Sequence, residues 1–317
     1  MKKLIAILLT ALICLTLTCP ALAEEEVYKI GVCQLVEHVA LDDATQGFKD
    51  ALTELLGDKV DIDVQKASGD SAICITIVNG FIAEDVDLIL ANATPALQAA
   101  QAGTDQIPIL GTSVTDYGTA LGIEDWTGVT GTNISGTSDL APLDGQAALI
   151  QELFPDAKEV GLLYCTAEAN SVYQVEAIEK YLTEMGYNCT PYGFTDSNDV
   201  ASVAQNACMN SDVLFTPTDN TVASCTEAIR NVVEIEGKAI NGGDEGICAG
   251  CGVATICINY YDIGYAAGEM AYEILVNGAD VSTMPVEFAP AFEKVCNAEL
   301  AEMLGVAIPE GYTVIGE

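Results

Sequence analysis

The chain has 317 residues, and half of them are apolar, so it can form a sizeable core and is not a disordered polypeptide. Its 47 acidic residues outnumber its 11 basic residues and give a net charge of −36. Such a charge repels nucleic acid and anionic membrane surfaces, so we expect neither as a partner.

The first segment, residues 1–23, has the features of a secretory signal peptide. Two lysines precede an apolar run over 4–17, and Ala21-Leu22-Ala23 fits a cleavage site. The run is shorter than the roughly 20 residues that a spanning helix needs, which disfavours an uncleaved anchor. We therefore expect an exported protein, in the periplasm or at the outer face of the cytoplasmic membrane. Lipid attachment at Cys19 stays open, although the residues before it depart from the usual lipoprotein motif.

Short apolar runs then alternate with segments whose apolar residues recur every three to four positions, which predicts an α/β fold with parallel sheets. The predicted strands are 28–35, 60–66, 87–91, 107–111, 128–132, 159–165, 188–193, 212–216, 238–242, 252–258 and 285–293. The predicted helices are 41–56, 70–83, 94–102, 142–153, 171–185, 198–209, 220–236, 261–277 and 297–304.

The first half of this pattern recurs in the second half. Residues 29–57 and 159–187 both read as strand, polar loop and helix, and each loop holds a glutamate. The repeat predicts two similar lobes facing each other across a cleft, the usual place for a small ligand. Residues 133–140 and 258–262 are candidate crossovers between the lobes. The predicted lobes are 24–136 plus 260–285 and 137–259 plus 286–317.

In open parallel sheets, ligands bind beyond the carboxyl ends of the strands. The side chains that follow the predicted strands are small, hydroxylic, amidic or acidic. Some of them are equally explained as helix N-caps, but their presence at so many strand ends favours a binding site. The candidates are Glu37, Thr94, Thr112, Ser113, Asp139, Glu168, Asn170, Ser171, Asp219, Asn220, Thr221 and Asp244.

Basic residues are scarce, and Arg230 is the only arginine. It lies well inside the predicted helix 220–236, so we expect it to miss the cleft. Any anionic group must then be held by main-chain N–H groups, hydroxyls and helix N-termini. This disfavours phosphorylated ligands and allows a zwitterion, with its ammonium on an aspartate or glutamate.

The cysteines do not predict a metal site. Cys248-x-x-Cys251 has Cys257 nearby, but no second pair completes a closed zinc site. We expect most cysteines to be small core residues, with a disulfide within 248–257 as the alternative. We expect no metal and no cofactor.

Common catalytic and phosphate-binding motifs are absent from the sequence. His38 is the only histidine, so any histidine-based chemistry must use it. The alternative function that stays open is an exported hydrolase or lyase that uses His38 with Glu37 or Asp244.

Eight runs of the sequence resemble the substrate-binding proteins of ABC importers, and more closely the subgroup associated with tryptophan, tyrosine or phenylalanine uptake. The runs are CQLVEH (33–38), LDDATQGFKDAL (41–52), IPILGTSVTD (107–116), GTSD (136–139), ANSVYQVE (169–176), PTDNTVAS (217–224), GDEG (243–246) and INYYDIGYAAGEMA (258–271). The resemblance implies a type I periplasmic-binding-protein fold, in which two Rossmann-like lobes are joined by a hinge of three crossovers. It also implies a monomer that closes on a small ligand without catalysis and docks on a membrane permease with its ATPase.

By the same resemblance, the expected contacts of an amino-acid ligand come from ten of the residues above. They are Glu37, Thr94, Ser113, Asp139, Glu168, Asn170, Ser171, Asp219, Asn220 and Asp244. We expect the carboxylate near Thr94-Pro95, Thr112-Ser113 or Asn220-Thr221, and the ammonium near Asp219, Asp244 or Glu168. Tyr173 is the candidate wall for an aromatic side chain, whereas Trp126 is expected to be a packed anchor. A ligand sensor for a signalling partner is a further alternative.

Overall fold

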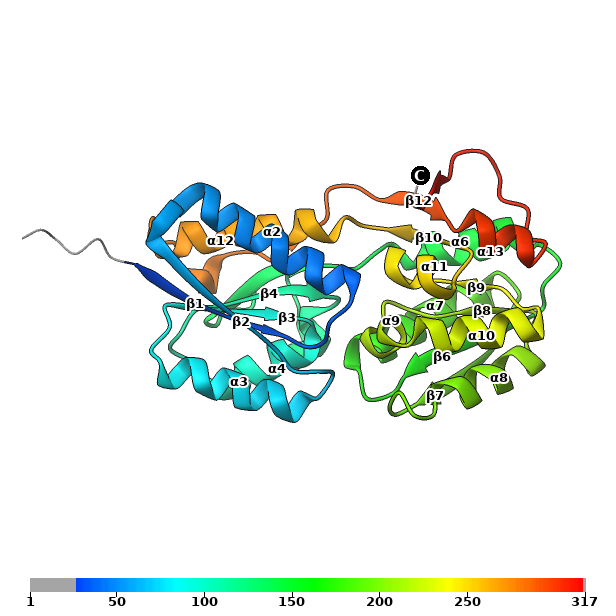
Figure 1. The fold of residues 1–317 in the computed structure, drawn as a ribbon, viewed down its shortest axis with the longest axis horizontal. Coiled ribbons are helices and arrows are strands. Elements are labelled where there is room, and N and C mark those ends of the chain that lie inside the picture. Colours follow the sequence, from blue (N-terminus) through cyan, green and yellow to red (C-terminus); the bar gives the residue numbers. More distant parts are fainter. Residues whose placement is uncertain (1–26, 316–317) are drawn as a thin grey trace, which may run out of the picture.

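The computed structural model describes residues 27–315, which form two α/β lobes joined along one edge (Figure 1). The predicted signal peptide and Cys19 lie outside the described residues. None of the helices in the described part of the chain is long and apolar enough to cross a membrane.

The first lobe is built on a six-stranded sheet in the order β11-β5-β4-β3-β1-β2, and its strand pairs are parallel. The apolar runs form a parallel sheet because helices bury both faces. The strands are β1 (Tyr28–Gln34), β2 (Val60–Lys66), β3 (Leu88–Asn92), β4 (Ile109–Val114), β5 (Ile134–Ser138) and β11 (Glu287–Phe288). The helices are α2 (Val39–Leu56), α3 (Ser71–Ala83), α4 (Thr94–Gly103), α5 (Tyr117–Leu121) and α12 (Tyr260–Leu275).

Two apolar clusters hold this lobe together. Ile30, Val32 and Leu90 face Phe48 of α2 and Met270 of α12 on one side of the sheet. The other side of the sheet packs against α3 and α4. The β-strand residues thus alternate between two buried faces, which is the period-2 pattern of a covered sheet.

The second lobe has a seven-stranded sheet in the order β13-β12-β10-β9-β8-β6-β7, parallel except for the antiparallel pair β10–β12. Its helices again cover both faces. The strands are β6 (Glu159–Cys165), β7 (Asn188–Phe194), β8 (Val213–Phe215), β9 (Ile240–Asn241), β10 (Ala254–Cys257), β12 (Glu293–Cys296) and β13 (Thr313–Val314). The helices are α6 (Leu143–Leu153), α7 (Ala169–Glu184), α8 (Val200–Asn210), α9 (Asn220–Ser224), α10 (Thr226–Glu236), α11 (Glu245–Cys251) and α13 (Ala298–Met303).

The chain passes between the lobes three times, after β5, after β10 and between β11 and β12. The three connections run together along the upper edge of the molecule in Figure 1. The predicted fold class, two lobes with parallel sheets and a three-crossover hinge, is confirmed. The lobe boundaries given above stay a prediction.

Three predicted elements are wrong in detail. Residues 128–132 are a loop, in which Gly128 and Gly131 adopt positive φ angles of 90° and 70°, and the strand β5 begins only at Ile134 within the predicted crossover 133–140. The predicted strand 285–293 divides into β11 and β12, with Pro290 between them, because proline has no N–H for a sheet ladder. The predicted helix 220–236 is interrupted at Cys225.

Three cysteines and Trp126, which the sequence suggested as packing residues, pack against the cores of the lobes. Cys248, Cys251 and Cys257 are buried in the second lobe, and no group of His, Cys, Asp or Glu within 27–315 is arranged to hold a metal ion. Trp126 is half-buried and stacks on Tyr117, with ring centroids 6.1 Å apart.

The close packing of α2 on α12 gives a testable prediction. A Cβ at Gly47 would overlap the main-chain oxygen of Tyr261, so the two helices could not stay at their present distance. We expect Gly47→Ala to lower the free energy of unfolding by about 3 kcal/mol, as measured by urea denaturation. The matched control is Gly80→Ala in α3, where a Cβ meets nothing within 4 Å. It should stabilise by up to about 1 kcal/mol, and equal effects of the two changes would contradict the packing argument.

Candidate functional site

The ends of β3 and β4 bring two backbone irregularities together at the edge of the first lobe. Ala93 and Ser113 have positive φ angles of 96° and 55°, a region that residues other than glycine rarely adopt. The two strands are adjacent, with Asn92 paired to Thr112, and the Ala93 N–H donates to the Thr112 carbonyl over 3.0 Å. Such strained positions persist only where surrounding structure holds them, and they cluster at binding sites.

Two hydroxyls beside these positions have no partner. Thr94 Oγ1 and Ser113 Oγ are buried without a hydrogen bond to any described residue, which costs about 1–3 kcal/mol for each group unless a ligand satisfies it. Thr94 begins α4, which has proline in its first turn and no side-chain cap. An uncapped helix N-terminus with two free hydroxyls is suited to bind a carboxylate.

Across the cleft, Glu168 occupies the N-terminus of α9. One carboxylate oxygen accepts from the main-chain N–H and the Nδ2 of Asn220 over 3.1 and 2.7 Å. The other accepts from the N–H and hydroxyl of Thr221 over 2.8 and 2.7 Å. Glu168 is buried, so this helix terminus already holds an anion that belongs to the chain itself.

We call the four hydrogen bonds that Asn220 and Thr221 donate to Glu168 the cage. Beside it lie Asn170, Ser171 and Asp219. The Asn170 amide donates to Glu168 and to the Thr218 carbonyl, but its buried Oδ1 has no partner among the described residues. Asp219 caps α9 through the Val222 N–H over 2.9 Å and also accepts from the Cys165 N–H over 2.7 Å. Burial, with the charge of Glu168 nearby, raises the pKa of Asp219. Asn170 Oδ1 is thus an unpaired acceptor in the same lobe as Glu168.

A second pair of carboxylates, Asp139 and Asp244, lies close enough together for their charges to interact. Asp139, in the first crossover, accepts from the hydroxyls of Thr115 and Tyr260 over 2.9 and 3.0 Å. Asp244 caps α11 through the Ile247 N–H over 2.8 Å. Burial raises the pKa of Asp139 to about 6, and burial together with the charge of Asp139 raises the pKa of Asp244 to about 7.

The ion pairs of the described residues join basic side chains to other carboxylates. Lys66 pairs with Asp42, Arg230 with Glu234 and Lys294 with Glu152. Arg230 also contacts Glu299, so it lies away from the cleft, as predicted. Buried carboxylates that lack a basic partner attract a cationic group, because burying a charge is costly unless it is paired.

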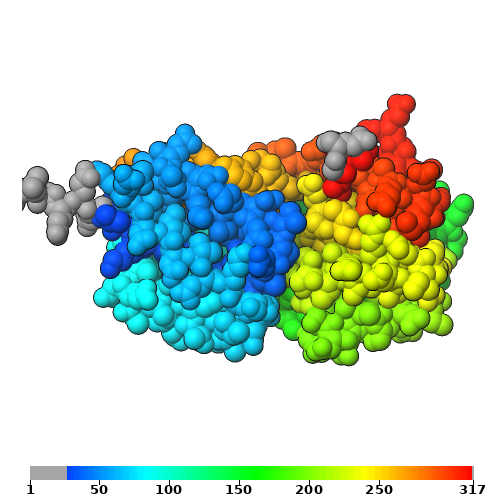
Figure 2. Space-filling view, in the orientation of Figure 1, coloured from blue at the N-terminus to red at the C-terminus, as the bar shows by residue number. Residues whose placement is uncertain are grey.

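His38 connects the two lobes. Its Nε2 lies 3.2 Å from Asn220 Oδ1, and burial lowers the pKa of its imidazole, against the opposing effects of the Asn220 hydrogen bond and the Glu168 charge. In the space-filling view the lobes meet along their facing edges, where the start of α2 touches the second lobe (Figure 2).

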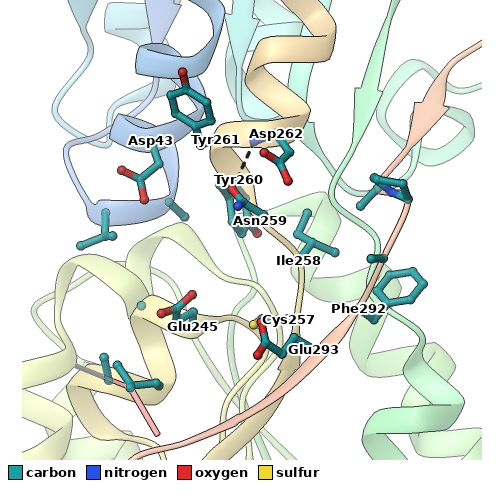
Figure 3. Close-up of a pocket in the computed structure, with 18 residues that line it drawn as sticks. Asp43, Glu245, Cys257, Ile258, Asn259, Tyr260, Tyr261, Asp262, Phe292 and Glu293 are labelled. Atoms are coloured by element: carbon teal, nitrogen blue, oxygen red, sulfur yellow. Dashed lines mark hydrogen bonds between the residues drawn. The ribbon is translucent and has the colours of Figure 1, made fainter. Parts of the chain in front are cut away.

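Two cavities lie between the lobes. The larger, of about 810 Å³, lies next to the hinge. Figure 3 shows Asp43 of α2 and Glu245 of α11 on opposite walls, with Tyr260 to their right. The smaller, of about 180 Å³, is lined by Leu35, Pro95, Glu168 and Asn220 among others. The smaller cavity therefore joins the start of α4 to the cage around Glu168.

Three predicted site residues belong neither to the start of α4, nor to the surroundings of Glu168, nor to the pair of Asp139 and Asp244. The Glu37 side chain is 75% exposed and lies 3.3 Å from Lys66. The Thr112 hydroxyl accepts from Thr137 inside the sheet. Tyr173 is half-buried on α7.

Sequence reasoning missed Tyr260, and it noted Thr115 as a residue at a strand end without choosing it as a candidate. Tyr260 lies within the predicted crossover 258–262, and that position was the available signal. Thr115 follows Ser113 at the end of β4, as the motif TSVTD shows.

The raised pKa values predict an unusual pH dependence. An unfolded aspartate has a pKa of about 3.9, so between pH 4 and 7 the folded chain holds protons on Asp139 and Asp244 that the unfolded chain has lost. Stability from these groups is therefore present at low pH and decreases as pH rises through this window. We expect the Tm of the ligand-free protein to fall by several degrees from pH 5 to pH 8, and Asp244→Asn, which can still cap α11, to fall less. A Tm that rises over this range would contradict the assignment.

The chain is similar in sequence to proteins that bind the substrates of ABC transporters. A family model described as ABC transporter substrate binding protein matches residues 29–315. A tyrosine-binding protein of Clostridioides difficile (strain R20291) is 35% identical over 278 residues, which cover 87% of this chain and 80% of that protein.

Two solved structures are similar over almost their whole length. An ABC domain from Streptococcus pneumonia in complex with L-Trp has a TM-score of 0.87 and 31% identity, covering 92% of this chain and 100% of that chain. A ligand-free, open structure of a substrate binding protein with adhesive properties from Clostridium difficile has a TM-score of 0.69 and 37% identity, covering 91% and 99%. The relative with the more similar sequence thus has the less similar structure, and this chain as a whole is structurally nearer to the L-Trp complex than to the open form.

Proposed function

This chain belongs to the family of ABC transporter substrate binding proteins, and on that premise we propose that it binds an aromatic amino acid between its lobes and delivers it to the permease of an ABC importer. The observation that carries the proposal is the uncapped start of α4, where the buried hydroxyls of Thr94 and Ser113 lack partners. A ligand carboxylate would satisfy both hydroxyls and the first N–H groups of the helix.

The second lobe supports the same orientation of the ligand. The N-terminus of α9, near Asn220 and Thr221, is occupied by Glu168, so it is a poorer carboxylate site than α4. Glu168 and Asp219 already accept several hydrogen bonds each. We therefore place the ligand ammonium toward Asp139 and Asp244, whose ionised forms it would stabilise.

The aromatic class rests on the relatives, one described as binding tyrosine and one solved with L-Trp. We propose that the ligand side chain enters the smaller cavity, where Leu35, Val36 and Pro95 provide apolar surface and Ser68 and Thr195 provide hydroxyls. Tyr173, on α7, which packs against α5, is proposed to border the site without enclosing it.

We propose that the protein works outside the cytoplasm and performs no chemistry. His38, the one candidate base, lies against an asparagine amide, and the relatives are described as binding proteins. Release of the ligand would follow when the lobes part around the three crossovers.

Thermal melting of the chain from Glu24 onward against the twenty amino acids, sugars and peptides tests the proposal. A ligand at about 100 times its Kd adds about 2.7 kcal/mol, which shifts the Tm of a protein of this size by roughly 5–10 °C. We expect shifts with tryptophan, tyrosine or phenylalanine. A shift with sugars alone would overturn the aromatic proposal, and a response to no compound would overturn the solute-binding role.

A further inference from the structure

The contact between His38 and Asn220 has no role in the ligand contacts proposed above. His38 belongs to the first lobe and Asn220 to the second, and neither residue is part of one of the three crossovers. Val39, the next residue after His38, lines the larger cavity, and Asn220 lines the smaller one. The contact therefore crosses the cleft in the region where both cavities approach each other.

The half of the contact in the second lobe is held in one orientation. Asn220 Nδ2 donates to Glu168 over 2.7 Å, and a carboxylate oxygen can only accept. The amide oxygen must therefore face away from Glu168, toward His38. Because Glu168 and Asn220 belong to the same lobe, this orientation does not depend on closure.

The His38 side chain, which is the first lobe's part of this contact, is also free to bond to Asn220. His38 occupies the N-cap position of α2, where serine, threonine, asparagine or aspartate would normally bond to the first turn. Its side chain makes no capping hydrogen bond. Since Asn220 offers only an oxygen, His38 must present an N–H at Nε2, in either the neutral or the charged ring.

We propose that His38 and Asn220 form a latch across the cleft, which holds the closed state and sets the rate of ligand release. This inference rests on the proposed function for its ligand but not for its geometry. A hydrogen bond that exists only in the closed state favours that state over the open one, and so slows dissociation with little effect on association.

The test compares His38→Ala with His38→Gln, whose amide can place an N–H near the position of Nε2. Stopped-flow binding of L-tyrosine and L-tryptophan should show His38→Ala releasing ligand about 3- to 10-fold faster, the range of one hydrogen bond, with association changed less than about twofold. His38→Gln should recover most of the loss. Gln46→Ala is the matched control, because it removes an exposed hydrogen bond from the same helix within one lobe.

A second variant separates the latch from a general loss of fold. Asn220→Ala should release ligand faster as well, and the double variant should be no faster than Asn220→Ala alone, because both changes remove one interaction. Additive effects, an unchanged release rate in His38→Ala, or a His38→Gln as fast as His38→Ala would overturn the latch.

X-ray scattering of the ligand-free protein tests the latch even if neither amino acid binds. His38→Ala should give a larger radius of gyration than the wild type and Gln46→Ala, because more molecules are open. Equal radii would overturn the latch. A wild type that binds neither ligand, with a larger radius for His38→Ala, would overturn the proposed ligand class and support the latch.

Discussion

Ser113→Gly is expected to stabilise the ligand-free protein while weakening ligand binding. Glycine adopts the φ angle of 55° found here without strain, and the change removes a buried hydroxyl that has no partner among the described residues. We expect the free energy of unfolding to rise by about 1 kcal/mol. We expect the affinity for the aromatic amino acid to fall by at least about 10-fold, because a hydrogen bond to a charged group is lost.

Calorimetry and urea denaturation of the same samples measure both effects. The matched control is Ser211→Ala. Ser211 also has a buried, unpaired hydroxyl, but it precedes β8 and so lies at the sheet edge opposite the cleft. This control should leave affinity unchanged. If Ser113→Gly kept full affinity, the proposed carboxylate site at α4 would be wrong.

Glu168→Gln is expected to destabilise the ligand-free protein strongly. The glutamine amide would direct its NH₂ group at donors that now meet a carboxylate oxygen, either on Asn220 or on Thr221. Because hydrogen bonds to charged groups contribute about 1.5–3 kcal/mol each, we expect a loss of about 3 kcal/mol and a Tm lower by roughly 10 °C. Circular dichroism melting measures this loss.

The control for this change is Glu176→Gln, an exposed position on α7, the helix that Glu168 precedes, which should melt like the wild type. A wild-type Tm for Glu168→Gln would mean that the cage at α9 does not hold this lobe together. The result would then reopen α9 as a site for the ligand carboxylate.

The sequence allowed the two-lobed architecture to be predicted because the pattern is local. Alternating apolar runs and amphipathic segments repeat in both halves, and β6 was predicted with its observed bounds, 159–165. The strand β5 was missed because the residues before it, with Gly128 and Gly131, contain an apolar pattern that the glycines turn into a loop. No local sequence pattern shows whether such a segment forms a strand or a loop.

The sequence allowed the residues of the candidate site to be predicted, but not their backbone conformation or their hydrogen-bond partners. The rule that ligands lie at strand ends brought Thr94 and Ser113 into view, yet the left-handed backbone at Ala93 and Ser113 has no signature in residue types that normally avoid it. The cage joins Glu168 to Asn220 and Thr221 across more than fifty residues of sequence. Only the folded chain shows that this glutamate already occupies a helix terminus.

A crystal structure of the protein grown with L-tyrosine or L-tryptophan tests the central claim most directly. The account predicts a closed protein with the ligand carboxylate within hydrogen-bond distance of Thr94 and Ser113, at the start of α4, and the ammonium toward Asp139 and Asp244. A ligand carboxylate at the start of α9 in place of Glu168, or a ligand bound outside the cleft, would contradict it.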